Sequence, residues 1–326
     1  MTATLPPDIR RVFDRFITTE FVTIDAKGQP IAWPVTPYHH AQEGCIDVTT
    51  GLGYPKKARD AQANPHVALL FSDPNGSGLD EPPMVLVQGT ATVDDQNLQA
   101  NWLRYERESA EKLPAAAEKL PPEFVRRKLM AWYYLRLYVH VRPERVYVWP
   151  EGDAQAEPQL LDAHMEEVRS GHNEEPEEHH DAPPGPPMAW DPRLDGIGSR
   201  QYPTAVVAVV GPDGFPFAVR VPVTPDRGAG LLRLGTDPVG VPLEPGKACV
   251  VVHRHDPDFT WQLNFQVRGD LVRDGDGWAL VPRKLVGGFQ LPKGNIAVMR
   301  ENLSKMRRYH KVAKAEMARR GAAPAS

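Results

Sequence analysis

The stretch "VTIDAKGQPIAWPVTP" (22–37) decides the fold, because a similar stretch, "AVVGPDGFPFAVRVPVTP" (208–225), returns later in the chain. Gly28 of the first stretch matches Gly214 of the second. Aligning the shared string "PVTP" leaves two extra residues in the second copy, an even number that preserves which strand face points inward. Three more blocks recur in the same order: 44–50 with 230–236, 66–71 with 247–252, and 85–93 with 265–272. The sequence therefore predicts one structural unit used twice.

Each repeated block is a short β-rich run bounded by Gly, Pro or Asp, which is typical of an antiparallel meander or barrel. The run 22–37 predicts a hairpin that turns at 26–28. Apolar periodicity predicts helices that flank the strands, at 7–17, 95–113, 122–133 and 295–320. The predicted fold is thus mainly β with flanking helices (α+β), arranged as two tandem barrels.

A composition break between the repeats predicts the domain boundaries. Residues 151–190 hold eleven Asp or Glu against one Arg and are rich in proline, so we expect an acidic linker that is a solvated tether. A first barrel then spans 1–150, and a second, degenerate barrel with a basic C-terminal helix spans 191–326. The linker contains four histidines, but their spacing matches no metal-ligand pattern, and we predict no metal site.

The composition excludes several classes of protein. The chain has 326 residues, 41% hydrophobic and 25% charged, which is typical of a soluble globular protein. Its apolar runs are too short to cross a bilayer, and its first residues lack the apolar core of a signal peptide. Two cysteines and a net charge of −4 indicate neither a disulfide framework nor a nucleic-acid partner. We expect a cytoplasmic protein without membrane or nucleic-acid contacts.

Two adjacent lysines in "VTTGLGYPKKARDAQANPHVALLF" (48–71) break a local rule. Pro55 suits the first position of a helix, which places Lys56 and Lys57 in the first turn. Cations there oppose the helix dipole, at about 0.3–1 kcal/mol each when exposed. A bound anion would make the placement of the lysines favourable, because free N–H groups, both ammonium groups and nearby hydroxyls would converge on the anion. The alternative is that both lysines are merely solvated.

The second copy favours the anion. Its equivalent segment, "TDPVGVPLEPGK" (236–247), is shorter, lacks the lysine pair and carries three prolines that forbid a regular helix. A helix needed only for folding should have been kept in both copies. Neither G-x-G-x-x-G nor a P-loop motif occurs at "GLG", so nucleotide-binding motifs do not explain the loop.

The order "GQPIAWPV", "DVTTG", "KKARDAQANPHVALLF" and "VLVQGTATV" resembles the split β-barrel flavin/deazaflavin oxidoreductases, the pyridoxamine 5'-phosphate oxidase-like group. The resemblance covers 8–150 and is weak in the second half. It implies split barrels of the FMN-binding type, with FMN as the default cofactor, the deazaflavin F420 as an alternative and haem less often. The cofactor-binding residues that it implies are Thr49, Thr50, Lys56 and Lys57 at the phosphate, Trp33, Pro34, Val35 and Thr36 along the ring system, and Gln88 nearby.

Other residues keep two interpretations. Tyr54 beside the lysines either covers the cofactor or caps the helix start, whereas 132–134 and Trp149 fit packing beneath the first barrel. The family builds its site between two barrels, so an intramolecular pseudo-dimer is expected, with 261–264 as the second barrel's contribution. Pairing of first halves in a homodimer is the competing arrangement.

We expect an oxidoreductase that transfers a hydride between the bound cofactor and a small organic substrate. Spacing suggests no Ser-His-Asp or Cys-His grouping, and no catalytic residue is predicted. The alternative is a non-catalytic module that binds or sequesters flavin or haem.

Overall fold

The structure, a computed structural model, describes residues 5–162, 186–288 and 296–320. The strands of the first half are β1 (Thr19–Ile24), β2 (Pro30–Val35), β3 (Tyr38–His40), β4 (Cys45–Gly51), β5 (His66–Phe71), β6 (Met84–Asp94) and β7 (Arg136–Trp149). Its helices are α1 (Pro7–Arg15), α2 (Lys56–Ala63), α3 (Leu98–Lys112), α4 (Pro114–Ala117), α5 (Glu123–Leu129) and α6 (Ala131–Tyr134).

The later part of the chain adds β8 (Gln159–Asp162) and a 3-10 turn at Pro192–Gly196. The second set of strands follows: β9 (Ala205–Val210), β10 (Pro216–Val221), β11 (Val223–Asp226), β12 (Leu231–Leu234), β13 (Gly246–His255), β14 (Gln262–Asp274) and β15 (Gly277–Gly287). Helix α7 (Ile296–Arg319) follows β15.

The two sheets have the same topology, which confirms the predicted fold class and the duplication. The first runs β2-β1-β5-β6-β7-β4-β3, with β8 added beside β7, and the second runs β10-β9-β13-β14-β15-β12-β11. All pairings between these strands are antiparallel. Each half begins with the predicted hairpin, which turns at a glycine with positive φ, Gly28 in one and Gly214 in the other.

The register corrects the sequence alignment. Pro34 pairs with Glu20 in the first sheet, and Arg220 pairs with Val206, the counterpart of Glu20, in the second. The strands that follow keep the same offset, because Tyr38 pairs with Asp47 as Thr224 pairs with Arg233. The prediction of two extra residues in the second copy is therefore wrong, since the "PVTP" strings do not occupy equivalent positions.

A matched irregularity supports the duplication independently of sequence. The β6–β7 ladder shifts register between Gln88 and Gly89, and the β14–β15 ladder shifts between Arg268 and Gly269. A Cβ atom on either glycine would overlap a carbonyl oxygen of the opposite strand. Only glycine fits such a close approach, so both copies require it at the bulge.

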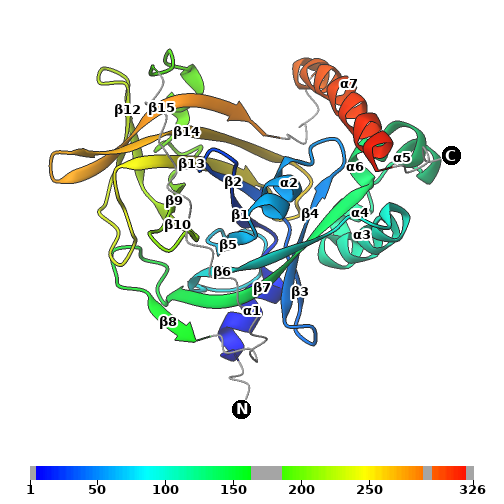
Figure 1. The fold of residues 1–326 in the computed structure, drawn as a ribbon, viewed down its shortest axis with the longest axis horizontal. Helices are drawn as coiled ribbons and strands as arrows, with labels where there is room; N and C mark the ends of the chain where they lie inside the picture. The colour runs from blue at the N-terminus through cyan, green and yellow to red at the C-terminus, as the bar shows by residue number, and fades with distance from the viewer. Residues whose placement is uncertain (1–4, 163–185, 289–295, 321–326) are drawn as a thin grey trace.

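The two sheets lie side by side and share a core (Figure 1). Strand β10 contacts β1, β5 and β6, and its counterpart β2 contacts β9, β13 and β14. Such reciprocal contacts are those of a two-fold symmetric pair. The shared core contains Val22, Leu70 and Trp149 from the first half with Val207 and Phe217 from the second.

The predicted linker differs at both of its ends from a solvated tether. Strand β8 pairs with β7, the carbonyl of Ala154 accepts a hydrogen bond from the amide of Val239, and the amide of Met188 donates to the carbonyl of Pro282. Ala154 is also buried. Part of 151–190 thus belongs to the folded body. Residues 163–185, with all four of the linker histidines, lie outside the described residues.

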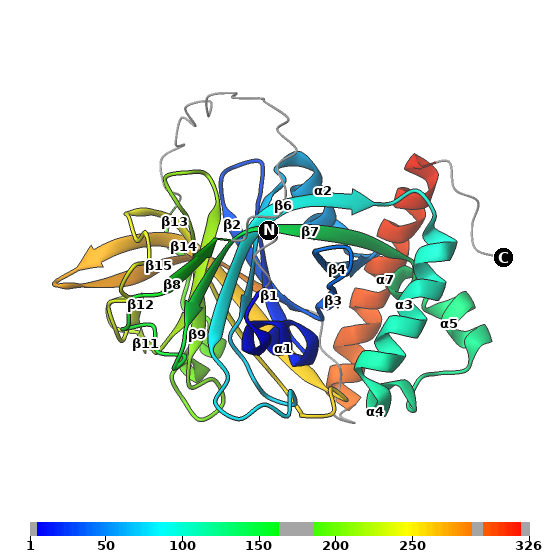
Figure 2. The ribbon, with the colours of Figure 1, turned by 90° about the horizontal axis from the view of Figure 1, so that it is seen from below.

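The C-terminal helix docks on the first half (Figure 2). Its Tyr309 stacks on Trp132 with ring centroids 5.1 Å apart, and Ala313 enters the core beneath the first sheet. The predicted helix 122–133 divides into α5 and α6, and α6 packs against α7. No helix among the described residues is long and apolar enough to span a membrane.

Candidate functional site

A cavity of about 600 Å³ lies where the two halves and α7 meet. The first half contributes β2, the start of α2 and the helices α3, α4 and α6, and the second half contributes β14 and the end of β15. Helix α7 adds Arg308, Tyr309 and Val312. The second half therefore supplies part of the cavity wall.

The cavity lining is strongly cationic. No aspartate or glutamate occurs among the described lining residues. The lining cations are Lys56, Lys57, Arg59, Lys119, Arg136, Arg268 and Arg308. A concave surface with one sign of charge concentrates ions of the opposite sign, so the cavity is suited to an anionic ligand.

The two lysines at the start of α2 have different surroundings. Lys56 is exposed and pairs with carboxylates, through Nζ at 2.8 Å from Asp60 Oδ1 and 3.6 Å from Asp25 Oδ2. Lys57 is half-buried, and no described carboxylate lies within ion-pair distance of its Nζ, which sits 5.7 Å from the centre of the Tyr54 ring. Burial, helped by the nearby Arg136 charge, lowers the pKa of Lys57 to about 7. The predicted anion contact thus rests mainly on Lys57.

The start of α2 adds to this preference for an anion. Pro55 is the N-cap residue and offers no side-chain acceptor to the first-turn amides, and no acidic residue lies in that turn. The exposed amides at a helix N-terminus attract negative charge.

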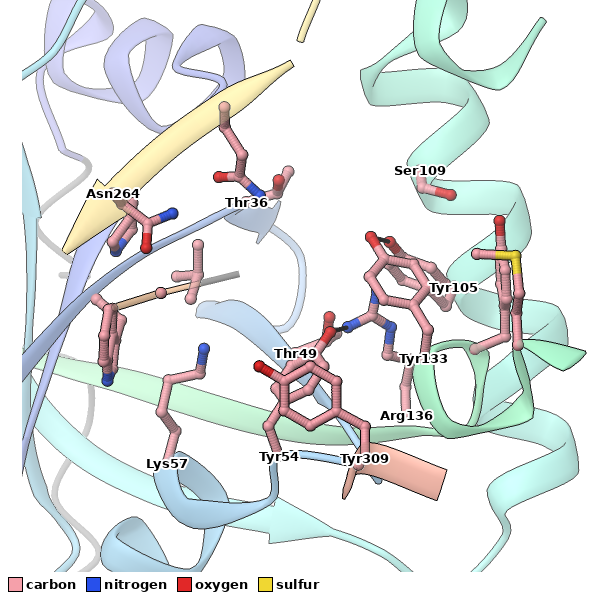
Figure 3. A pocket seen from close by; sticks show the side chains of 18 of the residues that line it. Thr36, Thr49, Tyr54, Lys57, Tyr105, Ser109, Tyr133, Arg136, Asn264 and Tyr309 are labelled. Atoms are coloured by element: carbon pink, nitrogen blue, oxygen red, sulfur yellow. Dashed lines mark hydrogen bonds between the residues drawn. The ribbon is translucent and has the colours of Figure 1, made fainter. Parts of the chain in front are cut away.

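Arg136 lies at the centre of the cavity wall (Figure 3). Its guanidinium is 3.9 Å from the ring centre of Tyr105 and 4.0 Å from that of Tyr133, and Nη1 donates to Tyr54 Oη at 3.2 Å. The side chain is buried, its Nε has no hydrogen-bond partner, and no ion pair links it to a described carboxylate. Buried charges are normally paired, so this one indicates a missing anionic partner.

Both halves form the barrel side of the cavity. Strand β2 contributes Trp33, and the second half contributes Asn264, which is labelled in Figure 3. A Cβ on Gly288 would overlap Asn264 and would lie 2.9 Å from Trp33. The absence of a side chain at Gly288 therefore lets Asn264 and the indole ring of Trp33 lie close to this backbone at the cavity wall.

The equivalent positions of the second half are closed. The strand registers give three equivalent pairs, namely Trp33 with Val219, Asn264 with Met84, and Gly288 with Trp149. Val219, Met84 and Trp149 are all buried in the shared core, and the rings of Trp149 and Phe217 are in contact. A bulky indole packed in the core thus stands at the place where a glycine lines the cavity. This difference is a reason to expect one site per chain.

The structure brings most of the predicted cofactor residues together. Those that line the cavity are Trp33, Pro34, Val35, Thr36, Thr49, Tyr54, Lys56 and Lys57. Thr50 instead donates its hydroxyl hydrogen bond to the carbonyl of Tyr54. Gln88 is buried outside the cavity and donates to the carbonyl of Pro216 across the interface between the halves. From the predicted segment 261–264, Gln262 and Asn264 line the cavity but Trp261 does not.

Sequence reasoning missed much of the helical wall and its central cation. Arg136 and Tyr105 were not singled out, and Tyr133 was assigned to packing beneath the barrel. One signal was available, since Arg136 interrupts the apolar run "AWYYLRLYVHV" (131–141). No such signal marks Tyr309, because the contact between α7 and the first half joins segments far apart in the chain.

No protein-family model matches the chain, and no curated protein matches it. Among solved structures with a split-barrel fold, an F420 reductase is 19% identical over 44% of this chain and 98% of its own, with a TM-score of 0.33. A protein from Clostridium acetobutylicum is related to general stress protein 26, of the pyridoxinephosphate oxidase family. It is 9% identical over 48% of this chain and 92% of its own, with a TM-score of 0.33. The haem storage protein HutZ from Vibrio cholerae is 14% identical over 45% of this chain and 95% of its own, with a TM-score of 0.33. These similarities concern the fold of about half the chain.

Proposed function

We propose that this protein is an oxidoreductase that binds a flavin- or deazaflavin-type cofactor in the cavity and transfers a hydride between it and a small organic substrate. The observation that carries the proposal is the cavity lining, where seven cations and no described carboxylate adjoin a barrel strand. A phosphate-bearing, planar ligand matches both parts of that lining.

The residues present fit the phosphate of such a cofactor. Lys57, the first-turn amides of α2 and Arg136 adjoin one another in the cavity, and no described carboxylate pairs with them. Trp33 and the amide of Asn264 would adjoin the ring system. The described lining residues include no histidine or cysteine to ligate a haem iron, so haem would depend on a tyrosine or on Met130 as its ligand.

The extent of the cationic lining favours a deazaflavin over FMN. One phosphate needs only the cluster around Lys57 and Arg136, but the lining continues to Lys119 and Arg308. The tail of a deazaflavin is longer and carries several negative charges, so these outer cations would have a role. FMN would leave them in contact with solvent alone.

A bound cofactor of this type supplies the hydride-carrying ring. The protein's own groups hold and enclose it. Lys57 and Arg136 would neutralise the phosphate, and Tyr54, whose pKa burial raises well above its usual value, stays protonated as a hydrogen-bond donor. Tyr309 of α7 and Tyr133 of α6 wall the cavity against water. Exclusion of water strengthens every charged contact inside.

The test begins with absorbance of the purified protein and mass identification of any released small molecule. We expect tight binding of a deazaflavin, weaker binding of FMN, and a stoichiometry of one per chain. Lys57→Ala should weaken binding about tenfold or more, as expected for a lost charge-assisted contact. Lys314→Ala, an exposed lysine of α7 outside the cavity, is the matched control.

Three outcomes are informative. A folded protein that takes up neither FMN nor a deazaflavin would refute the proposal. Binding without any hydride transfer to or from the cofactor would favour the non-catalytic binding module. Unfolding of Lys57→Ala, measured by circular dichroism, would show that the lysine serves stability instead.

A further inference from the structure

A cluster of metal-ligating side chains lies outside the cavity, on the face of the first sheet where β3, β4 and β7 adjoin. Cys45 and Asp47 are two residues apart on β4 and thus share a face, and His140 is the register partner of Asp47 on β7. One ligand atom of each of the three lies within 4.8 Å of the other two. None of them lines the cavity.

One distance in the cluster equals that between two ligands of a bound metal ion, and another is shorter. Cys45 Sγ lies 3.5 Å from Asp47 Oδ1, and His140 Nδ1 lies 2.7 Å from the same oxygen. Ligands of a tetrahedral Zn²⁺ ion, with bonds of about 2.0–2.3 Å, are separated by roughly 3.3–3.8 Å. His140 would have to withdraw from Asp47 to reach this separation, and it is the half-exposed member of the set. The same exposure leaves a coordination position for water.

The outer contacts are those that orient ligands. Asp47 directs Oδ1 at Cys45 and His140, while Oδ2 accepts a hydrogen bond from Arg104 Nη2 at 2.5 Å. Arg104 is itself neutralised by Glu108, through Nε to Oε1 at 2.7 Å. Hydrogen bonds of this kind commonly fix the second oxygen of a ligating carboxylate. A thiolate and a carboxylate would also balance the charge of a divalent ion.

The second copy of the fold shows that the sheet does not need these residues. By strand register, Cys45, Asp47 and His140 correspond to Leu231, Arg233 and Ala279. A Cys–Asp–His set on one sheet face, held in one copy only, is therefore a feature of the first half. We propose that Cys45, Asp47 and His140 bind a divalent cation that accepts sulfur ligands, of which Zn²⁺ is the type that a mixed S, O and N set suits best.

Cobalt(II) is the direct probe, because a thiolate bound to Co²⁺ absorbs in the near ultraviolet. The full chain is treated with a chelator, dialysed and titrated with Co²⁺. We expect one Co²⁺ per chain with the thiolate band, displacement by Zn²⁺, and a rise in Tm on addition of Zn²⁺. Because outer contacts commonly change metal affinity by 10–100-fold, Arg104→Gln should weaken Zn²⁺ binding by that order.

The controls separate this site from other thiols and from misfolding. Cys45→Ser should abolish the band, whereas Cys249→Ser should keep it, since Cys249 is also buried and its thiol donates to Gln266. His140→Gln changes a half-exposed residue and should keep the fold while weakening Co²⁺ binding at least tenfold. No thiolate band, a band that survives Cys45→Ser, or unchanged affinity in a folded His140→Gln would each overturn the proposal and leave the cluster as a hydrogen-bond network only.

Discussion

Lys57 and Arg136 are the two residues on which the proposed phosphate contact mainly depends. Both are cations withdrawn from water, and neither has an ion-pair partner among the described carboxylates. Folding without a ligand therefore leaves two like charges near one another in a partly dry site, which is unfavourable. Sites of function commonly retain such unfavourable groups, because the ligand provides the missing interaction.

The pKa of Lys57 predicts how cofactor affinity depends on pH. That pKa lies near 7 in the free protein because of burial and then of Arg136, and a bound phosphate would raise it. Affinity should therefore be nearly constant just below pH 7 and fall by up to tenfold per pH unit above it. The phosphate loses its second proton near pH 6, so its own titration contributes little to the change in affinity above pH 7. Equilibrium titrations between pH 6.5 and about 9 measure the effect.

Lys57→Arg is the matched variant, since a guanidinium keeps its proton throughout that range. Its affinity should remain flat to higher pH than that of the natural protein. If the natural protein binds equally well at pH 7 and 9, Lys57 does not contact the phosphate as a titrating cation.

The sequence located the charged end of the site but not its closure. Lys57 could be singled out because a broken local rule and a missing counterpart in the repeat were both visible in the sequence. The inference for Gln88 failed for a physical reason: strand alternation directs its side chain across the interface to the carbonyl of Pro216. Which half of the molecule packs on which face of β6 depends on tertiary contacts, and local sequence patterns do not predict these.

At the scale of elements, α7 is the least expected feature. The sequence predicted its length and basic character well, but its position depends on contacts with α2 and α6. Glu316 is buried and gathers three arginines, with Arg320 Nη1 at 2.9 Å, Arg319 Nη2 at 3.1 Å and Arg59 of α2 in contact. One carboxylate thus links α7 to the helix that begins at the lysines.

Glu316→Gln should loosen α7 without unfolding the sheets. Loss of the carboxylate removes charge-assisted hydrogen bonds, at about 1.5–3 kcal/mol. Amide hydrogen exchange in 305–319 should then be about tenfold to a hundredfold faster, while exchange in β5 and β6 stays unchanged. Cofactor affinity should fall as well, because α7 supplies a wall of the cavity.

Glu111→Gln, an exposed residue of α3, is the control for this change. Slow exchange throughout α7 in Glu316→Gln would contradict the anchoring role. Faster exchange across both sheets would instead show that α7 and the sheets unfold as one unit.

At the scale of the whole molecule, a buried ion pair joins the two halves. Glu20 of β1 accepts from Arg220 Nη2 at 2.8 Å and from Ser72 Oγ at 2.7 Å, and it also contacts His253. Burial raises the pKa of Glu20, but Arg220 and His253 outweigh burial and hold that pKa at about 2. The carboxylate is therefore stabilised by folding, and its contribution depends on contacts across the interface.

Glu20→Gln should destabilise the molecule by about 3 kcal/mol at neutral pH, the range expected when one partner of a buried pair is removed. The folded-state pKa lies below the usual value of 4.5, so this contribution is complete above about pH 4.5 and is lost as pH falls towards 2. Urea unfolding at pH 7 and at pH 3 measures both parts, and the variant should show the smaller loss between them.

Asp213→Asn is the control, because Arg145 and Asp213 form a second ion pair across the halves that is largely exposed. Exposed pairs contribute about 0–1 kcal/mol, so this change should have little effect. Equal losses in the two variants would contradict the special role of the buried pair.

The architecture as a whole was the most predictable part. Strand alternation, turn residues and the repeat determined the number of sheets and their antiparallel order, because these depend on short-range chemistry. The exact equivalence of the copies was less accessible. The shared string "PVTP" suggested an insertion, yet the registers show none, because a short identity can arise at positions with different pairing partners.

The contrast between Gly288 and Trp149 has an evolutionary consequence. In a dimer of identical subunits, every substitution occurs at both symmetric sites at once. A bulky side chain that fills one site would therefore fill the other as well. Joining the two copies in one polypeptide removes that restriction, and each place can then mutate alone. The glycine that lines the cavity and the indole packed in the core are therefore a mark of lost symmetry. Selection for ligand contacts can act on the open place while the filled one evolves for packing.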